Sequence, residues 1–182
     1  MRIISGKHGG RKFYPPNNIP TRPTTDFAKE ALFNILENNF DLTEIKFLDL
    51  FMGTGNISYE FSSRGCEYIV AVDQFGACVQ FANGMIEKLK IEGMNVYKSD
   101  VLKFLENKLS SFDIIFAGPP YAYEKIDKLP EIILNKGILN TRGWFILETS
   151  PKHSFETNPY FLQKRNYGDT FFHIFSTTKI RP

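Results

Sequence analysis

The chain has few of the residues on which disulfide-stapled or metal-binding proteins depend. Its 182 residues include two cysteines, Cys66 and Cys78, and three scattered histidines. Two cysteines at this spacing form neither a disulfide framework nor a metal cluster. We therefore expect both thiols in the core and no metal site. The sequence also has no catalytic triad, histidine pair or Cys-x-x-Cys pattern, so it offers no chemistry of those kinds.

Long hydrophobic runs are absent as well. No apolar stretch approaches the roughly 20 residues of a membrane helix, and residues 1–20 lack the apolar core of a signal peptide. We therefore expect a cytoplasmic protein without membrane contact. At 42% hydrophobic and 23% charged residues, with 18 phenylalanines, the composition predicts a globular domain with a substantial core.

The net charge of +2 is small, but it is distributed unevenly. Residues 1–25 contain five basic side chains and no acidic one, whereas the other 157 residues contain 17 basic and 20 acidic side chains. A basic terminal segment is typical of proteins that contact phosphates, because each such contact releases counterions. The alternative is a solvated tail with no partner.

Two short β-prone runs, residues 2–5 and 11–14, flank a glycine-containing turn. This pattern predicts a hairpin whose tip presents Lys7 and His8 to solvent. Four prolines between residues 15 and 23 predict an extended connection after it. We divide the chain into a basic hairpin and extended arm, 1–24, and one larger domain, 25–182.

From residue 26 onward, short apolar runs alternate with helical patterns. A threonine N-cap opens the first helix, with apolar residues at helical spacing through Leu36. The runs 46–50, 68–72, 96–99, 113–117 and 144–147 predict strands, and 56–64, 75–90, 101–108 and 124–136 predict helices. This alternation predicts a Rossmann-like α/β fold with a parallel sheet. The runs 160–167 and 170–177, joined by Gly168-Asp169, predict a final antiparallel pair.

A glycine-rich turn, Gly53-Thr54-Gly55, follows the first of these strands and precedes a helix. Such a turn lets a ligand approach the backbone. Asp49, Asp73 and Asp100 lie at the ends of three successive strands, where a carboxylate can accept hydrogen bonds from ribose hydroxyls. Dinucleotide binding fits less well, because Ser58 occupies the third glycine position and the chain has no room for a separate substrate domain. The pattern predicts a site for a nucleoside cofactor.

Two segments resemble motifs of S-adenosylmethionine-dependent methyltransferases. Residues 49–55 resemble the first motif, D-x-F-x-G-x-G. Residues 118–121, Gly-Pro-Pro-Tyr, resemble the fourth motif of enzymes that methylate exocyclic amines, which usually begins with Asp or Asn. Two prolines stop the strand sharply at this point. The resemblance implies that this segment orients the target amine and that the tyrosine stacks on an extruded base.

Gly118 is the main departure from that motif, because it has no side chain to accept a hydrogen bond from the amine. Such a bond contributes roughly 1.5–3 kcal/mol when the acceptor is charged. We therefore expect reduced or unusually supported catalysis, and an increase in turnover on replacing Gly118 with Asp.

With residues 1–6, 22–26, 29–34 and 167–170 added, the chain resembles the bacterial RsmD family over most of its length. The resemblance implies a seven-stranded methyltransferase sheet with an antiparallel last strand. It implies transfer of a methyl group from S-adenosylmethionine to the N2 amine of a guanine in 16S ribosomal RNA, free or in the assembling 30S particle, by a monomer without a metal. A non-catalytic RNA-binding module and an enzyme acting on DNA adenine or protein glutamine remain alternatives.

The residues expected to form the site fall into three groups. Catalytic roles are expected for Gly118, Pro119, Pro120 and Tyr121. Cofactor contacts are expected for Asp49, Phe51, Gly53, Thr54, Gly55, Asp73, Gln74, Asp100 and Val101. RNA contacts are expected for Arg2, Lys7, Arg11, Lys12, Arg22 and Thr24.

Overall fold

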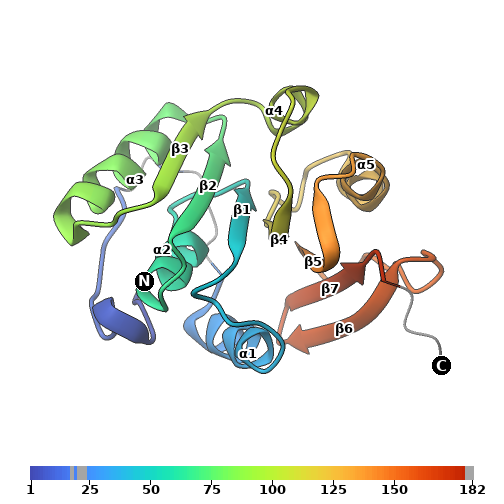
Figure 1. The fold of residues 1–182 in the computed structure, drawn as a ribbon, viewed down its shortest axis with the longest axis horizontal. Coiled ribbons are helices and arrows are strands. Elements are labelled where there is room, and N and C mark those ends of the chain that lie inside the picture. Colours follow the sequence, from blue (N-terminus) through green and yellow to red (C-terminus); the bar gives the residue numbers. More distant parts are fainter. Residues whose placement is uncertain (17–18, 20–23, 179–182) are drawn as a thin grey trace.

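The computed structural model describes residues 1–16, 19 and 24–178. Within this part of the chain, seven strands form one sheet in the order β3-β2-β1-β4-β5-β7-β6 (Figure 1). β7 runs antiparallel to both of its neighbours, and the other pairings are parallel. The predicted α/β fold with a final antiparallel pair is confirmed. The strands are β1 Lys46–Leu50, β2 Tyr68–Asp73, β3 Met94–Lys98, β4 Phe112–Ala117, β5 Leu139–Thr149, β6 Phe161–Tyr167 and β7 Thr170–Ser176.

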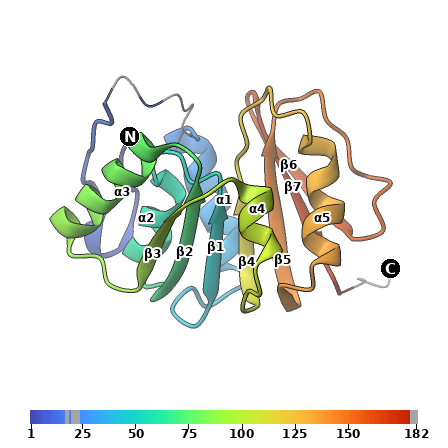
Figure 2. The same ribbon diagram turned by 90° about the horizontal axis from the view of Figure 1, so that it is seen from above.

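Helices cover both faces of the sheet (Figures 1 and 2). One face packs against α1, α2 and α3, and the other against α4 and α5. The predicted helix 124–136 is too long, since a 3-10 turn at Ile126–Lys128 precedes α5 and a proline lies in the first turn of α5. The helices are α1 Asp26–Glu37, α2 Asn56–Ser63, α3 Gly76–Leu89, α4 Val101–Glu106 and α5 Leu129–Asn135.

Strand alternation in β1 decides which way its one acidic side chain points. Phe47 belongs to the core beneath α1, α2 and α3, whereas Leu48 and Leu50 belong to the core on the opposite face. Asp49 therefore lies on the Phe47 side of the sheet. That side faces α2, where Phe61 stacks on Phe47 with 3.7 Å between ring centroids.

The amino-terminal segment is a tight hairpin, although only one isolated bridge, Arg2 to Lys12, has strand character. The Ile3 amide donates to the Arg11 carbonyl at 3.0 Å, and the Gly10 amide donates to the Ile3 carbonyl at 2.8 Å. The turn between them is a 3-10 helix, Gly6–His8. The prediction of an exposed His8 is wrong: its amide donates to Ser63 Oγ, and the side chain is buried against α2.

Three charged side chains, here called the anchor cluster, fix this hairpin to the domain: Lys29, Glu60 and Arg64. The Glu60 carboxylate accepts the amides of Ile4 and Ser5 at 2.7 and 3.0 Å. It also lies 3.3 Å from Lys29 Nζ and 2.9 Å from Arg64 Nε. Both Lys29 and Glu60 side chains are fully buried, so the hairpin is an integral part of the packed structure.

The first helix cap and the two cysteines agree with the sequence predictions. Thr25 caps α1, with its Oγ1 accepting the Ala28 amide at 3.2 Å. Cys66 and Cys78 are free and buried, as expected. Among the described residues, no helix is both long and apolar enough to span a bilayer, and no His, Cys, Asp and Glu residues are grouped as in a metal site.

Candidate active site

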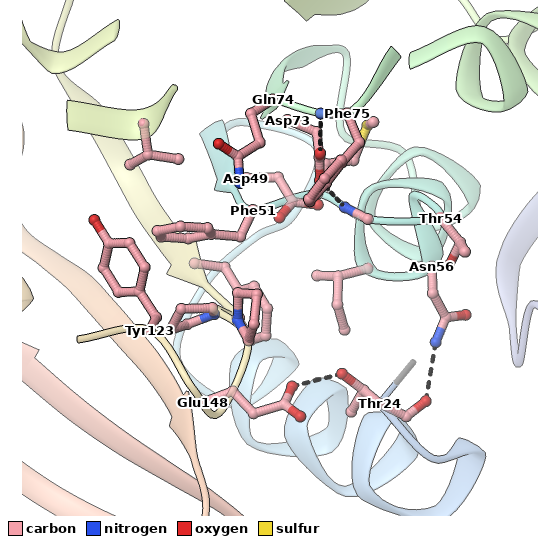
Figure 3. Close-up of a pocket in the computed structure, with 18 of the residues that line it drawn as sticks. Thr24, Asp49, Phe51, Thr54, Asn56, Asp73, Gln74, Phe75, Tyr123 and Glu148 are labelled. Carbon is pink, nitrogen blue, oxygen red and sulfur yellow. Dashed lines mark hydrogen bonds between the residues drawn. The ribbon is translucent and has the colours of Figure 1, made fainter. Parts of the chain in front are cut away.

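A cavity of about 290 Å³ lies at the carboxyl ends of the parallel strands (Figure 3). Its lining comes from the ends of β1, β2, β4 and β5, from the segments that follow β1 to β4, from the start of α2 and from Thr24 near the start of α1. Parallel α/β sheets bind ligands at this edge. The lining includes most of the residues predicted for catalysis and cofactor binding, together with one predicted to contact RNA: Asp49, Phe51, Gly53, Thr54, Asp73, Gln74, Asp100, Val101, Gly118, Pro119, Pro120 and Tyr121, and Thr24.

The turn after β1 bends back sharply toward α2. Phe51, Gly53 and Gly55 have φ values of 64°, 57° and 79°, in the left-handed region that favours glycine. A Cβ atom on Gly55 would lie 2.4 Å from the Tyr59 ring. Gly55 is not part of the cavity lining, and its closeness to Tyr59 gives it a packing role.

Asp73 holds two loops of the cavity together. One carboxylate oxygen accepts the Gly53 amide and the other accepts the Phe75 amide, both at 2.8 Å (Figure 3). A carboxylate offers about four acceptor positions. Asp73 can therefore fix these loops and still accept hydrogen bonds from a ligand.

Asp49 lies deeper, below the turn. It is 1% exposed, and the Ser58 hydroxyl donates to it at 2.5 Å. Burial, followed by repulsion from Asp73 and Glu148, raises the pKa of Asp49 to about 7, although the Ser58 hydrogen bond opposes the shift. Ser58, which departs from a dinucleotide motif, is therefore the hydroxyl that satisfies this buried acid.

Asp100 has a structural role in addition to the predicted one. Its side chain caps α4 by accepting the Lys103 amide at 3.0 Å, and it is exposed at the cavity rim. Val101 beside it is buried and adds apolar surface. The predicted convergence of Asp49, Asp73 and Asp100 is confirmed, since all three line the same cavity.

The cavity is acidic. We call its four carboxylates the acidic lining: Asp49, Asp73, Asp100 and Glu148. No Lys, Arg or His of the described residues belongs to the lining. Burying several carboxylates in one cavity is costly, and a bound cation reduces that cost. S-adenosylmethionine has a positive sulfonium and a nucleoside, so the charges and acceptors of the cavity fit this cofactor.

The Gly-Pro-Pro-Tyr segment forms the wall opposite the glycine turn. The Gly118 amide donates to the Leu50 carbonyl at 3.3 Å, which ties the segment to the end of β1. The Tyr121 hydroxyl reaches the Asp169 carbonyl at 3.5 Å, and its side chain is 37% exposed. Tyr123 packs edge-on against Phe51, with 5.0 Å between ring centroids. The Tyr121 side chain therefore lines the cavity and is partly exposed.

Glu148 and Asn56 were not predicted as site residues. The Thr24 hydroxyl donates to Glu148 Oε2 at 2.6 Å, and the Asn56 amide donates to the Thr24 carbonyl at 3.1 Å (Figure 3). Glu148 follows the strand predicted at 144–147. The signal that identified Asp73 and Asp100, an acid at a strand end, is present there too.

The predicted RNA-binding residues do not form one group. Lys7, Arg11 and Lys12 are exposed on the hairpin, and none of them lines the cavity. Arg2 lies 3.5 Å from Asp26, so its charge is partly balanced. Thr24 lies in the cavity, and Arg22 is outside the described residues.

The fold and the cavity define a class of protein. A seven-stranded sheet with an antiparallel β7, and a cavity with acidic residues at the carboxyl ends of its strands, characterise class I S-adenosylmethionine-dependent methyltransferases. Residues 1–176 match the model of the family described as "Conserved hypothetical protein 95". The chain belongs to this family, the RsmD family.

Relatives support that assignment over most of the chain. YlbH of Bacillus subtilis is 33% identical over 152 residues, which cover 81% of this chain and 82% of YlbH. Ribosomal RNA small subunit methyltransferase D of Escherichia coli strain K12 is 28% identical over 159 residues, 87% of this chain and 79% of that protein.

Solved structures agree on the fold. YhhF of Escherichia coli matches with a TM-score of 0.83 at 25% identity, over 96% of both chains. The 16S rRNA N2 methyltransferase RsmC of Thermus thermophilus, solved with AdoMet and guanosine, has a TM-score of 0.68 at 20% identity. That match covers 85% of this chain and 44% of RsmC, and it shows likeness of fold.

Proposed function

We propose that this chain transfers a methyl group from S-adenosylmethionine to the N2 amine of a guanine in small-subunit ribosomal RNA. The observation that carries the proposal is the meeting of the acidic lining and the Gly-Pro-Pro-Tyr wall in one cavity. The name of the relative in Escherichia coli, ribosomal RNA small subunit methyltransferase D, supports an RNA substrate.

The cofactor is S-adenosylmethionine, which supplies an activated methyl group. The residues suited to hold it are Asp73, whose remaining acceptor positions match ribose hydroxyls, and the backbone of the turn at Gly53. Phe51 and Val101 offer apolar surface for an adenine ring. The acidic lining favours positive charge at this position.

The chain's contribution to the reaction is orientation of the acceptor. The carbonyl groups of Gly118 and Pro119 can accept hydrogen bonds from the amine, which directs the nitrogen lone pair toward the methyl donor. Tyr121 offers a stacking surface for the extruded base. Overall, the amine nitrogen would gain a bond to the methyl carbon, the bond from that carbon to the sulfonium sulfur would break to leave S-adenosylhomocysteine, and the nitrogen would lose one proton to solvent.

Methyl incorporation from labelled S-adenosylmethionine tests the proposal. The acceptors are 30S particles and free 16S RNA lacking the modification, with DNA and total protein as the comparison. We expect label in the RNA, and nuclease digestion followed by mass spectrometry should identify N2-methylguanine. Cofactor binding without incorporation would favour a non-catalytic RNA-binding module, and label in adenine or glutamine would support the other alternative.

A further inference from the structure

A carboxylate from a neighbouring strand lies beside the position where this motif lacks its own side chain. β4 and β5 pair in parallel, with Ala117 opposite Leu147. The next residues along these strands are Gly118 and Glu148. An ideal Cβ atom on Gly118 would lie 3.9 Å from Glu148 Oε2. The Glu148 carboxylate therefore adjoins the space that an Asp or Asn side chain would enter.

The position of this carboxylate is held from its far side. Oε2 accepts the Thr24 hydroxyl at 2.6 Å, and the Thr24 carbonyl accepts the Asn56 amide at 3.1 Å. Asn56 Oδ1 in turn accepts Lys29 Nζ at 2.7 Å. Glu148 is 8% exposed and lines the cavity. It is thus a buried acceptor with a fixed orientation, and such preorganisation strengthens hydrogen bonds to a substrate.

We propose that Glu148 supplies the acceptor that Gly118 lacks and that it selects guanine as the base. This inference rests on the proposed function. Guanine presents two adjacent donors, N1–H and the N2 amine, and a carboxylate can accept from both. Adenine presents an N1 acceptor beside its amine, which a carboxylate repels. A site built to accept these donors therefore discriminates against bases that lack them.

Glu148 also changes the effect expected from adding an acid at position 118. A Cβ atom there would lie 3.2 Å from Phe116 Cε1, a contact that the phenylalanine ring must relieve. The added carboxylate would face Glu148, and two carboxylates at one site do not ionise together readily. Gly118→Asp alone should therefore lower turnover, contrary to the expectation from the motif. In a Glu148→Ala background, the same change should raise it.

The test compares the wild type with Glu148→Gln, Glu148→Ala, Gly118→Asp and the double variant Gly118→Asp/Glu148→Ala. Methyl transfer to 30S particles gives kcat and KM, and calorimetry gives affinity for S-adenosylmethionine. Loss of charged hydrogen bonds should lower kcat of Glu148→Gln roughly 10- to 100-fold, with cofactor affinity within about threefold of wild type. The double variant should regain about tenfold over Glu148→Ala. Glu131→Gln, on the exposed side of α5, is the matched control.

Four outcomes would overturn the inference, and the last of them would overturn the proposed function as well. Glu148→Gln turning over within about threefold of wild type would show that the carboxylate is not used. An equal loss of cofactor affinity and rate would assign Glu148 to the cofactor. A double variant no faster than Glu148→Ala would show that the two positions do not share a role. If the wild type itself labels adenine or protein, the proposed function fails and this inference fails with it.

Discussion

The molecule contains two buried groups of charged side chains that differ in one respect. In the anchor cluster, Glu60 lies within 3.3 Å of Lys29 and 2.9 Å of Arg64, and it accepts two backbone amides. In the acidic lining, Asp49, Asp73 and Glu148 are buried, and no basic side chain of the described residues shares their cavity. Within the described residues, basic side chains contact Glu60, whereas the lining of the cavity includes none.

This difference separates a structural role from a binding role. A buried carboxylate with basic partners and backbone donors satisfies itself and needs no ligand. Burial, with repulsion from Asp73 and Glu148, raises the pKa of Asp49, and a carboxylate with a perturbed pKa in a cleft marks a functional site. We therefore expect substitutions in the anchor cluster to change stability and substitutions in the acidic lining to change ligand affinity.

The largest expected effect is on stability, from Lys29→Met. Removing the lysine leaves Glu60 buried with less compensation, and breaking such a pair costs roughly 3–5 kcal/mol of unfolding free energy. Urea unfolding measures the change, with Lys103→Met at an exposed position of α4 as the control. A stable variant with sharply reduced cofactor affinity would contradict the division of roles.

Asp73→Ala, in contrast to Lys29→Met, should mainly lower the affinity for the cofactor. It removes the acceptor of two loop amides and of the cofactor, so affinity for S-adenosylmethionine should fall about 100-fold by calorimetry. Asp113 is a matched control, because it also accepts two hydrogen bonds, from Lys46 and Asn140, at 2.8 and 2.7 Å. It lies at the start of β4, so Asp113→Ala should reduce stability and leave cofactor affinity intact. Equal affinities for the two variants would refute the assignment.

Asp49→Asn should change how the free energy of unfolding depends on pH. The folded-state pKa of Asp49 is raised from 3.8 to about 7, so its favourable contribution to folding is fully present below about pH 4 and is lost as pH rises to about 7. The slope it causes is at most about 1.4 kcal/mol per pH unit. Unfolding free energies measured across this range should lose that slope in the variant. In the wild type, cofactor affinity should rise as Asp49 ionises; a pH-independent affinity would argue against Asp49 facing the bound cation.

The smallest expected effect is on RNA affinity, from substitutions on the exposed hairpin. Charge reversal at Arg11 and Lys12 should weaken RNA binding and reduce the slope of log affinity against log salt by about one for each phosphate that the variant no longer neutralises. Cofactor affinity should not change, because neither residue lines the cavity. Filter binding at several salt concentrations measures the slope, and unchanged RNA affinity would leave the hairpin as a structural element only.

Local patterns were enough to predict which strand ends meet at the part of the cavity that we propose for the cofactor. The turn at residues 49–55 and the acids at 73 and 100 each lie at the junction of a strand and a helix, and parallel strands bring such junctions to one edge. The exposure of His8 was predicted wrongly because the turn that contains it packs against α2, where the His8 amide contacts Ser63, 55 residues away. No local pattern carries that information.

The sequence by itself determined the strand and helix periodicity, the glycine turn and the acids at the strand ends, because these depend on neighbouring residues. Only the tertiary structure decided what adjoins Gly118. Thr24 and Glu148 are separated by 124 positions, and their contact exists because β5 pairs with β4 while α1 begins beside the cavity. A side chain supplied by another strand can replace one missing from a motif, and only the spatial arrangement of the strands reveals it.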